Sequence, residues 1–182
     1  MYQSKILITI LGAILLGCGW VSTAAAADYA EDRALIEDLM ARYLFALDFR
    51  DPKTYAETFT ENGILDYGRG EVKGRQAIHD LIDGMRKTAE EAAAKDTSGL
   101  RPAAGRHNVS NMVIKVDGDK ATARAYWFHH GNENPERSSS VTSYGHYVDE
   151  LEKVNGQWLF SKRKIYNEQV EEWAAPKGNP SW

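Results

Sequence analysis

Cysteine is almost absent from this chain of 182 residues, because Cys18 is the only one. A single thiol cannot form an internal disulfide, and it cannot build a thiolate metal site. The fold must therefore be stabilised by a packed hydrophobic core, which a chain of this length can bury.

An excess of positive charge is also lacking. The sequence has 22 Lys and Arg against 26 Asp and Glu and shows no basic stripe, so neither nucleic acid nor an anionic membrane is expected as a partner. Linkers rich in proline, glycine or serine and internal repeats are missing as well. These absences favour one globular domain.

The N-terminal segment differs from the rest. Lys5 precedes an almost uninterrupted apolar run, Ile6 to Val21, and the stretch Ser22 to Ala27 contains an Ala-x-Ala cleavage site. This pattern predicts a secretory signal peptide over residues 1–27. The mature protein would then begin at Asp28 and be exported, to the periplasm or outside the cell.

Two alternatives to this cleavage stay open. The apolar run approaches the ~18 residues that a membrane anchor needs to span a bilayer. The tetrapeptide Leu15 to Cys18 resembles a lipobox, in which Cys18 would carry a lipid, although Leu16 is unusual at its position. Cleavage at the alanines would instead remove Cys18 and leave a mature chain with no thiol and no membrane contact.

Apolar residues at helical spacing dominate the first half of the mature chain. Helices are expected over about residues 31–47, from 51 to a last buried residue at Phe59, and from about 74 through a solvated continuation at 88–95. A short strand is expected at 63–67, and a loop at 96–105.

Strand patterns dominate the second half. The turn signals Asp117-Gly118-Asp119 and Asn155-Gly156 predict hairpins, with long strands over residues 107–116, 121–130, 141–154 and 157–166. Helices followed by hairpins indicate an α+β domain over residues 28–172, in which a curved sheet wraps over helices. Residues 173–182 are expected to form an extended C-terminal arm, either disordered or covering a neighbouring subunit.

Three polar residues stand out because their neighbours are apolar. Asp48 ends the first expected helix, His107 opens a long strand, and Arg163 lies within the last strand. A carboxylate at the end of a buried stripe needs a partner. If Asp48 held one ring nitrogen of His107, the other nitrogen would be a base, and Arg163 could stabilise developing negative charge.

Each of these residues also has a purely structural interpretation. Asp48 could cap the following turn, His107 could be an ordinary strand side chain, and Arg163 could belong to a solvated face with its neighbouring lysines. The pair His129-His130, together with His107 and His146, raises a metal site as a further alternative. Adjacent strand residues point to opposite faces, however, and no spacing typical of zinc ligands is present, so an additional acid or base in the pocket is the better interpretation.

Several short motifs follow one another along the mature chain: Tyr43 to Asp48, Arg106 to Asn111, Gly145 to Leu151, Asn155 to Trp158, and Lys162-Arg163. Together they resemble the SnoaL-like superfamily, which has the nuclear transport factor 2-like fold. They are most similar to the branch that holds scytalone dehydratase and hexachlorocyclohexane dehydrochlorinase.

The resemblance implies a cone-shaped half-barrel, often a homo-oligomer (trimer or dimer), that uses no metal or organic cofactor. It implies that Asp48 orients His107, which abstracts a proton from carbon while a hydroxyl or chloride leaves. Arg163 matches an arginine of the dehydrochlorinase-like members. Asp66-Tyr67 resembles a pair whose tyrosine, in scytalone dehydratase, helps to activate a carbonyl through water.

Departures from the family pattern concern the substrate. Tyr43 stands where the dehydrochlorinase has a catalytic lysine, and Gly145 and Tyr147 stand where scytalone dehydratase has a serine and an asparagine that hold its substrate. Neither of those substrates is therefore expected. The residues expected to bind the substrate are Tyr43, Asp66, Tyr67, Tyr126, His129 and Tyr147.

The sequence thus predicts a cofactor-independent lyase, of dehydratase or dehydrohalogenase type, or an isomerase. Its substrate would be a small cyclic, largely apolar molecule, with His107 as general base, Asp48 as its orienter and Arg163 as electrostatic stabiliser. One alternative is an exported noncatalytic protein that binds a small molecule in the same pocket. Another is a ketosteroid-isomerase-like enzyme with Asp66 as the base.

Overall fold

The computed structural model describes residues 21–100 and 102–181. Most of the predicted signal peptide, including Cys18, lies outside these residues, so its cleavage stays a prediction. Residues 21–27 continue the first helix. Within the described part of the chain, no helix is both long enough and apolar enough to cross a membrane.

Helices α1 (Val21–Asp48), α2 (Pro52–Glu57) and α3 (Arg75–Lys95) pack on one curved sheet. Its strands are β1 (Phe59–Asp66), β2 (Glu71–Lys73), β3 (Gly105–Asp117), β4 (Lys120–Gly131), β5 (Ser140–Val154) and β6 (Gln157–Asn167), and a 3-10 turn, η1 (Glu171–Trp173), follows. The spatial order is β2-β1-β6-β5-β4-β3, and only β1 and β6 run parallel. This arrangement confirms the predicted α+β half-barrel.

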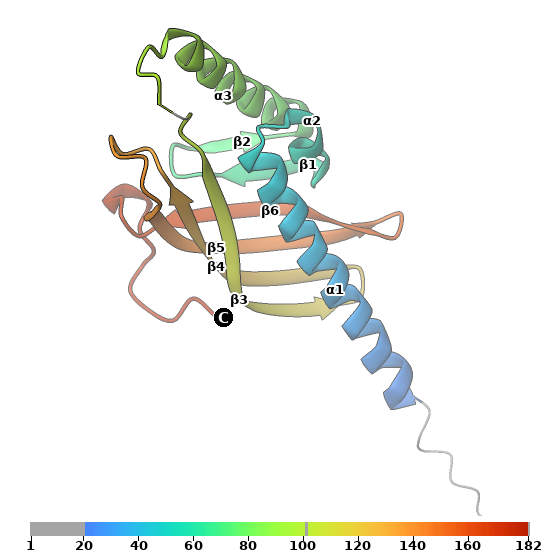
Figure 1. The fold of residues 1–182 in the computed structure, drawn as a ribbon. Helices are drawn as coiled ribbons and strands as arrows, with labels where there is room; N and C mark the ends of the chain where they lie inside the picture. Colours follow the sequence, from blue (N-terminus) through green and yellow to red (C-terminus); the bar gives the residue numbers. More distant parts are fainter. Residues whose placement is uncertain (1–20, 101, 182) are drawn as a thin grey trace, which may run out of the picture.

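Helix α1 crosses one face of the sheet, here called the inner face, while α2 and α3 lie together beyond β1 at one end (Figure 1). Ile36, Leu39, Met40 and Tyr43 recur at helical spacing and are fully buried. This single apolar stripe is what holds α1 on the sheet.

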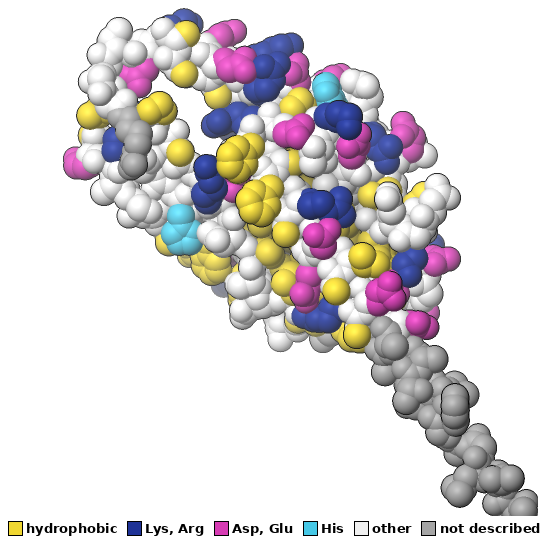
Figure 2. Space-filling model, turned by 45° about the vertical axis from the view of Figure 1, so that its right-hand side comes forward, with side chains coloured by type: hydrophobic (Ala, Val, Ile, Leu, Met, Phe, Trp, Pro, Cys, Tyr) yellow, Lys and Arg dark blue, Asp and Glu magenta, His cyan; other side chains and the backbone are white. Residues whose placement is uncertain are grey.

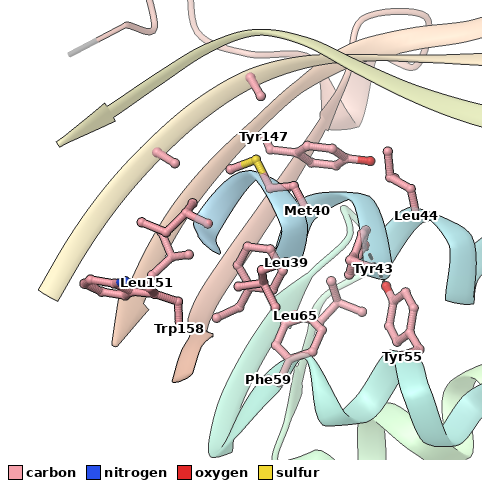
Figure 3. Close-up of a cluster of buried hydrophobic side chains, with 14 of the residues drawn as sticks. Leu39, Met40, Tyr43, Leu44, Tyr55, Phe59, Leu65, Tyr147, Leu151 and Trp158 are labelled. Carbon is pink, nitrogen blue, oxygen red and sulfur yellow. Dashed lines mark hydrogen bonds between the residues drawn. The ribbon is translucent and has the colours of Figure 1, made fainter. Parts of the chain in front are cut away.

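Aromatic rings fill much of the core between α1 and the sheet. The ring centroid of Tyr43 lies 4.6 Å from that of Tyr55 and 5.7 Å from that of Phe160. The hydroxyl of Tyr55 donates a hydrogen bond to the hydroxyl of Tyr43 over 2.6 Å (Figure 3). Two hydroxyls can therefore be buried here without remaining unpaired.

An ion pair lies inside this aromatic core. Nε and Nη2 of Arg163 donate to the two carboxylate oxygens of Asp149 over 2.8 and 2.7 Å, and both side chains are 0% exposed. The guanidinium carbon lies 4.2, 4.0 and 3.9 Å from the ring centroids of Tyr43, Tyr147 and Phe160. Burial disfavours the charge, but the adjacent Asp149 carboxylate outweighs burial and raises the pKa of Arg163 above its usual value.

Helix α1 begins at Val21 instead of about residue 31, and two boundaries in the sheet were also wrong. Phe59 does not end the short helix: it begins β1, because the N–H of Phe160 donates to the carbonyl of Thr58 and draws this segment into the sheet. Gly105 does not belong to the loop, because it pairs with Gly131 as the first residue of β3. Both corrections depend on partners distant in sequence.

Helix α1 ends in a turn that favours glycine but contains arginine. Arg50 has a φ of 50°, and the N–H of Asp51 donates to the carbonyl of Ala46 over 2.9 Å. A residue with a side chain in this left-handed conformation costs about 1 kcal/mol relative to glycine.

We expect Arg50→Gly to stabilise the protein by about 1 kcal/mol, because glycine adopts this conformation without strain. Urea unfolding would measure the change. Arg42→Gly is the control: Arg42 lies in the interior of α1 and contacts Asp38, so its replacement should destabilise by about 1 kcal/mol. A loss of stability in Arg50→Gly would contradict the prediction.

We expect Arg163→Met to lower the free energy of unfolding by about 3–5 kcal/mol, because it leaves the Asp149 carboxylate buried and unpaired. Adding Asp149→Leu should recover most of that loss, since the pair is then replaced by apolar groups. Chemical denaturation of the three variants would test this. A cost of under about 1 kcal/mol for Arg163→Met would show that Arg163 is not part of a structural pair.

Candidate functional site

A pocket of about 440 Å³ opens where the end of α1, helix α3 and the start of β3 meet. Its lining residues are Leu47, Asp48, Phe49, Arg50, Met85, Ala103, Ala104, Gly105, Arg106, His107, His129 and Glu133. Figure 2 shows the molecule hollowed beside the segment that joins α3 to β3, with hydrophobic and basic side chains adjoining the hollow.

Asp48 and His107 form a hydrogen-bonded pair in this pocket. Oδ1 of Asp48 lies 2.6 Å from Nδ1 of His107, and the two carboxylate oxygens also accept from the backbone N–H of His107 over 3.2 and 3.0 Å. An ionised carboxylate only accepts hydrogen bonds, so Nδ1 carries the proton and Nε2 has the free lone pair. The side chain of Asp48 is 5% exposed and that of His107 is 21% exposed, which leaves the imidazole accessible.

The fold explains why these two residues meet. Asp48 is the last residue of α1, immediately beyond the buried stripe, and β3 passes this helix end. His107 is directly opposite His129 of β4. A bulge follows between Ser110 and Val113, where Asn111 has a φ of 51°. Bulges bend a strand and reorient its side chains, so this one places the first residues of β3 over the helix end.

His129 forms the pocket wall beside His107. The two ring centroids are 4.5 Å apart, and Nδ1 of His129 lies 2.5 Å from the hydroxyl of Thr142. Burial lowers the pKa of His129, and a positive charge on the nearby His107 would lower it further, so the imidazole of His129 is neutral near pH 7. Gly105 is required here, because a β-carbon at this position would collide with the ring of His129.

Three predicted site residues lie in the core instead of the pocket. Arg163 does point to the inner face, but it is fully enclosed by Asp149 and aromatic rings. Tyr43 is 0% exposed and bonded to Tyr55, and Tyr147 is 2% exposed and stacked on Trp127. None of these side chains lines the pocket, so its lining gives no support to the expectation that they contact a substrate, and that expectation stays a prediction.

Asp66, Tyr67 and Tyr126 also lie away from the pocket. Asp66 follows the buried Leu65, so alternation turns it to the outer face, where it contacts Lys164 over 3.3 Å. Tyr67 packs edge-on against Trp173, and Tyr126 is 44% exposed. Asp66 does not line this pocket, so the carboxylate-base alternative gains no support from the geometry of the pocket.

Histidines on the outer face belong to other contacts. His146 is 4% exposed, with Nδ1 3.1 Å from Glu168 and its ring stacked on Tyr166. His130 lies near the amide of Asn108. In the part of the chain that the structure describes, no group of three or more His, Cys, Asp or Glu is placed to hold a metal ion.

Sequence reasoning missed most of the other lining residues. Phe49, Arg50 and Glu133 lie in turns, Met85 comes from α3, and Arg106 precedes the histidine. No periodic pattern connects them, because they come from separate segments. The only signal was local: hydrophobic residues and arginines immediately next to Asp48 and His107.

Comparisons with known proteins agree with this fold. A model of the SnoaL-like domain matches residues 28–164. No curated protein matches the chain. A structure described as an NTF2-like protein with a cystatin-like fold, from Novosphingobium aromaticivorans, is 26% identical, with a TM-score of 0.65 over 81% of this chain and 88% of that one.

Two further solved structures are similar. A protein of Novosphingobium aromaticivorans provisionally named a scytalone dehydratase is 26% identical, with a TM-score of 0.61 over 86% of this chain and 96% of that one. A Catenulispora acidiphila protein in complex with S-DNPA is 22% identical, with a TM-score of 0.62 over 77% and 96% of the two chains. Because the domain model covers residues 28–164 and these structures share the fold, the chain belongs to the SnoaL-like domain family.

Proposed function

We propose that this protein is a lyase or isomerase that abstracts a proton from carbon with His107 as general base. The observation that carries the proposal is the 2.6 Å contact between Asp48 and Nδ1 of His107, in a pocket that leaves the imidazole partly exposed. The provisional name of the similar Novosphingobium protein is consistent with this reaction class.

The reaction needs only groups that line the pocket. Nε2 of His107 takes a proton from a carbon next to an electron-withdrawing group, and the electrons of that C–H bond form a new C=C bond. In an elimination, the leaving group departs from the adjacent carbon with its electron pair and, as hydroxide, receives the proton back from the imidazolium. In an isomerisation, the imidazolium returns the proton to another carbon. Asp48 holds the ring and stabilises its positive charge.

The substrate class follows from the pocket walls. Leu47, Phe49, Met85, Ala103 and Ala104 present apolar surface, which suits a small, largely apolar ring. His129 is neutral and stands beside the base, where it could contact a carbonyl or leaving-group oxygen. A positioned base of this kind contributes typically ~10²–10⁴-fold to a rate.

A binding protein without catalysis is the second candidate. The observation in its favour is that Arg163 and Tyr43 are enclosed in the core, so the pocket lacks the donors expected from the family pattern. In that case Asp48 and His107 would hydrogen-bond a ligand without exchanging a proton with it.

We expect His107→Ala to slow proton abstraction by ~10²-fold or more, because no other imidazole is oriented by a carboxylate in this pocket. Exchange of the α-hydrogens of cyclic ketones in D₂O, followed by NMR, detects this step even without a leaving group. A panel of cyclic β-hydroxy and β-halo ketones then tests elimination. His79→Ala is a matched control, since His79 forms an exposed pair with Asp80 and should change nothing.

The thermal stability of Asp48→Asn and His107→Ala separates a functional pair from a structural one. Functional residues are often retained at some cost to stability, so both variants should melt at or above the wild-type temperature. If both lose ~2 kcal/mol or more, as for a broken buried hydrogen bond, and exchange rates stay within a few-fold of wild type, the proposed catalytic role is wrong.

A further inference from the structure

Two arginines at the pocket have no acidic partner among the described residues. Arg50 lies in the turn after α1 and Arg106 at the start of β3, and both line the pocket that holds His107. Arginines that do contact a carboxylate include Arg33, Arg42, Arg75, Arg86 and Arg163. The positive charges of Arg50 and Arg106 are therefore not neutralised by an ion pair within the described residues.

Arg106 is held in position without losing its charge. Its guanidinium carbon lies 4.6 Å from the ring centroid of Phe49, and Nη1 donates to the carbonyl of Gly105 over 2.6 Å. No hydrogen bond from its Nε or Nη2 reaches another residue in the described part of the chain. A guanidinium stacked on a ring keeps such in-plane donors available for a carboxylate.

Arg50 occupies a position where its backbone is strained. Its φ of 50° favours glycine, yet the chain carries arginine there. Residues in such conformations cluster at functional sites. Its side chain also lines the adjoining hollow along α3, with Leu81 and Met85, so its charge lies at the α3 side of the pocket.

The acidic groups of the pocket do not neutralise these arginines. Asp48 accepts three hydrogen bonds from His107 and is 5% exposed. Glu133 lies toward His129, whose pKa it affects. The pocket thus has apolar walls on one part of its lining and two exposed arginines on another.

We infer that the natural ligand of this pocket is an amphipathic anion: an apolar body that faces His107 and a single carboxylate-like group that Arg50 and Arg106 bind at the rim. The orientation of the apolar body toward His107 rests on the proposed function. The inference itself concerns only the binding of the ligand. Anchoring one end of the ligand would place one C–H bond, rather than several, next to Nε2 of His107.

Two fluorescent probes with nearly the same apolar body provide the test. One, 8-anilinonaphthalene-1-sulfonate, carries an anionic group, and the other, N-phenyl-1-naphthylamine, carries none. We expect the wild-type protein to bind the anionic probe more tightly, and that preference to weaken with added salt. Each of Arg50→Gln and Arg106→Gln should weaken the anionic probe roughly fivefold, as expected for a partly exposed ion pair, and leave the neutral probe unchanged.

Two further variants control for location. Arg69→Gln is matched to Arg106→Gln, because Arg69 also stacks on a ring, that of Trp173, but lies outside the pocket, so this variant should bind both probes normally. Ala104→Trp, which fills the pocket, should abolish binding of both. Circular dichroism and melting temperature check that each variant is folded.

Any of three results would overturn the inference: equal binding of the two probes, an anion preference that survives both arginine substitutions, or binding that persists in Ala104→Trp. Because no turnover is measured, these results are independent of the proposed reaction. If Arg50→Gln and Arg106→Gln lose the anion preference but hydrogen exchange does not depend on His107, the ligand class is supported and the catalysis is rejected. If hydrogen exchange depends on His107 but the two arginine variants keep the anion preference, the catalysis is supported and the ligand class is rejected.

Discussion

The guanidinium of Arg163 and the carboxylate of Asp149 meet at the centre of the molecule, where water cannot solvate either charge. A pair of this kind is tolerated only if nearly every polar atom finds a partner and the surroundings are polarisable. The rings of Tyr43, Tyr147 and Phe160 provide those surroundings. They also occupy the interior of the half-barrel, so the space left for a ligand lies at its open end.

Because aromatic rings fill the interior of the half-barrel, only the groups that remain accessible at the pocket can take part in chemistry. Figure 3 shows Tyr43, Tyr55 and Tyr147 packed among aliphatic side chains from α1 and the sheet. Hydroxyls buried in this way cannot contact a ligand unless the core opens. The groups that remain accessible belong to the end of α1 and the first residues of β3 and to the wall formed by His129. A base oriented by a carboxylate and a neutral imidazole beside it suit proton transfer at carbon better than hydrolysis by a nucleophile.

The same contacts that orient His107 also connect helix and sheet. Asp48 binds both the ring and the backbone N–H of His107, so the helix end and the strand are joined at the point where chemistry is proposed. Arg106 and Phe49 continue this connection at the rim. These contacts hold the base and the adjoining arginine on one side of the pocket.

Local pattern was sufficient for much of this protein. Helical spacing in α1 and the hairpin turns at residues 117–119 and 155–156 predicted an α+β domain, because these features depend on residues close in sequence. The half-barrel and the pairing of Asp48 with His107, 59 positions apart, were predicted from the resemblance of several motifs to the SnoaL-like superfamily. Only the tertiary structure decided where the other candidates lie. Arg163 faces inward as alternation requires, yet whether that space holds ligand or side chains depends on Asp149 and on rings from three segments. Asp66 faces outward in the strand that pairs with β6. Arg50 and Arg106 meet at the pocket because the end of α1 and the bulged strand β3 come together there. No local pattern in the sequence encodes how these elements combine.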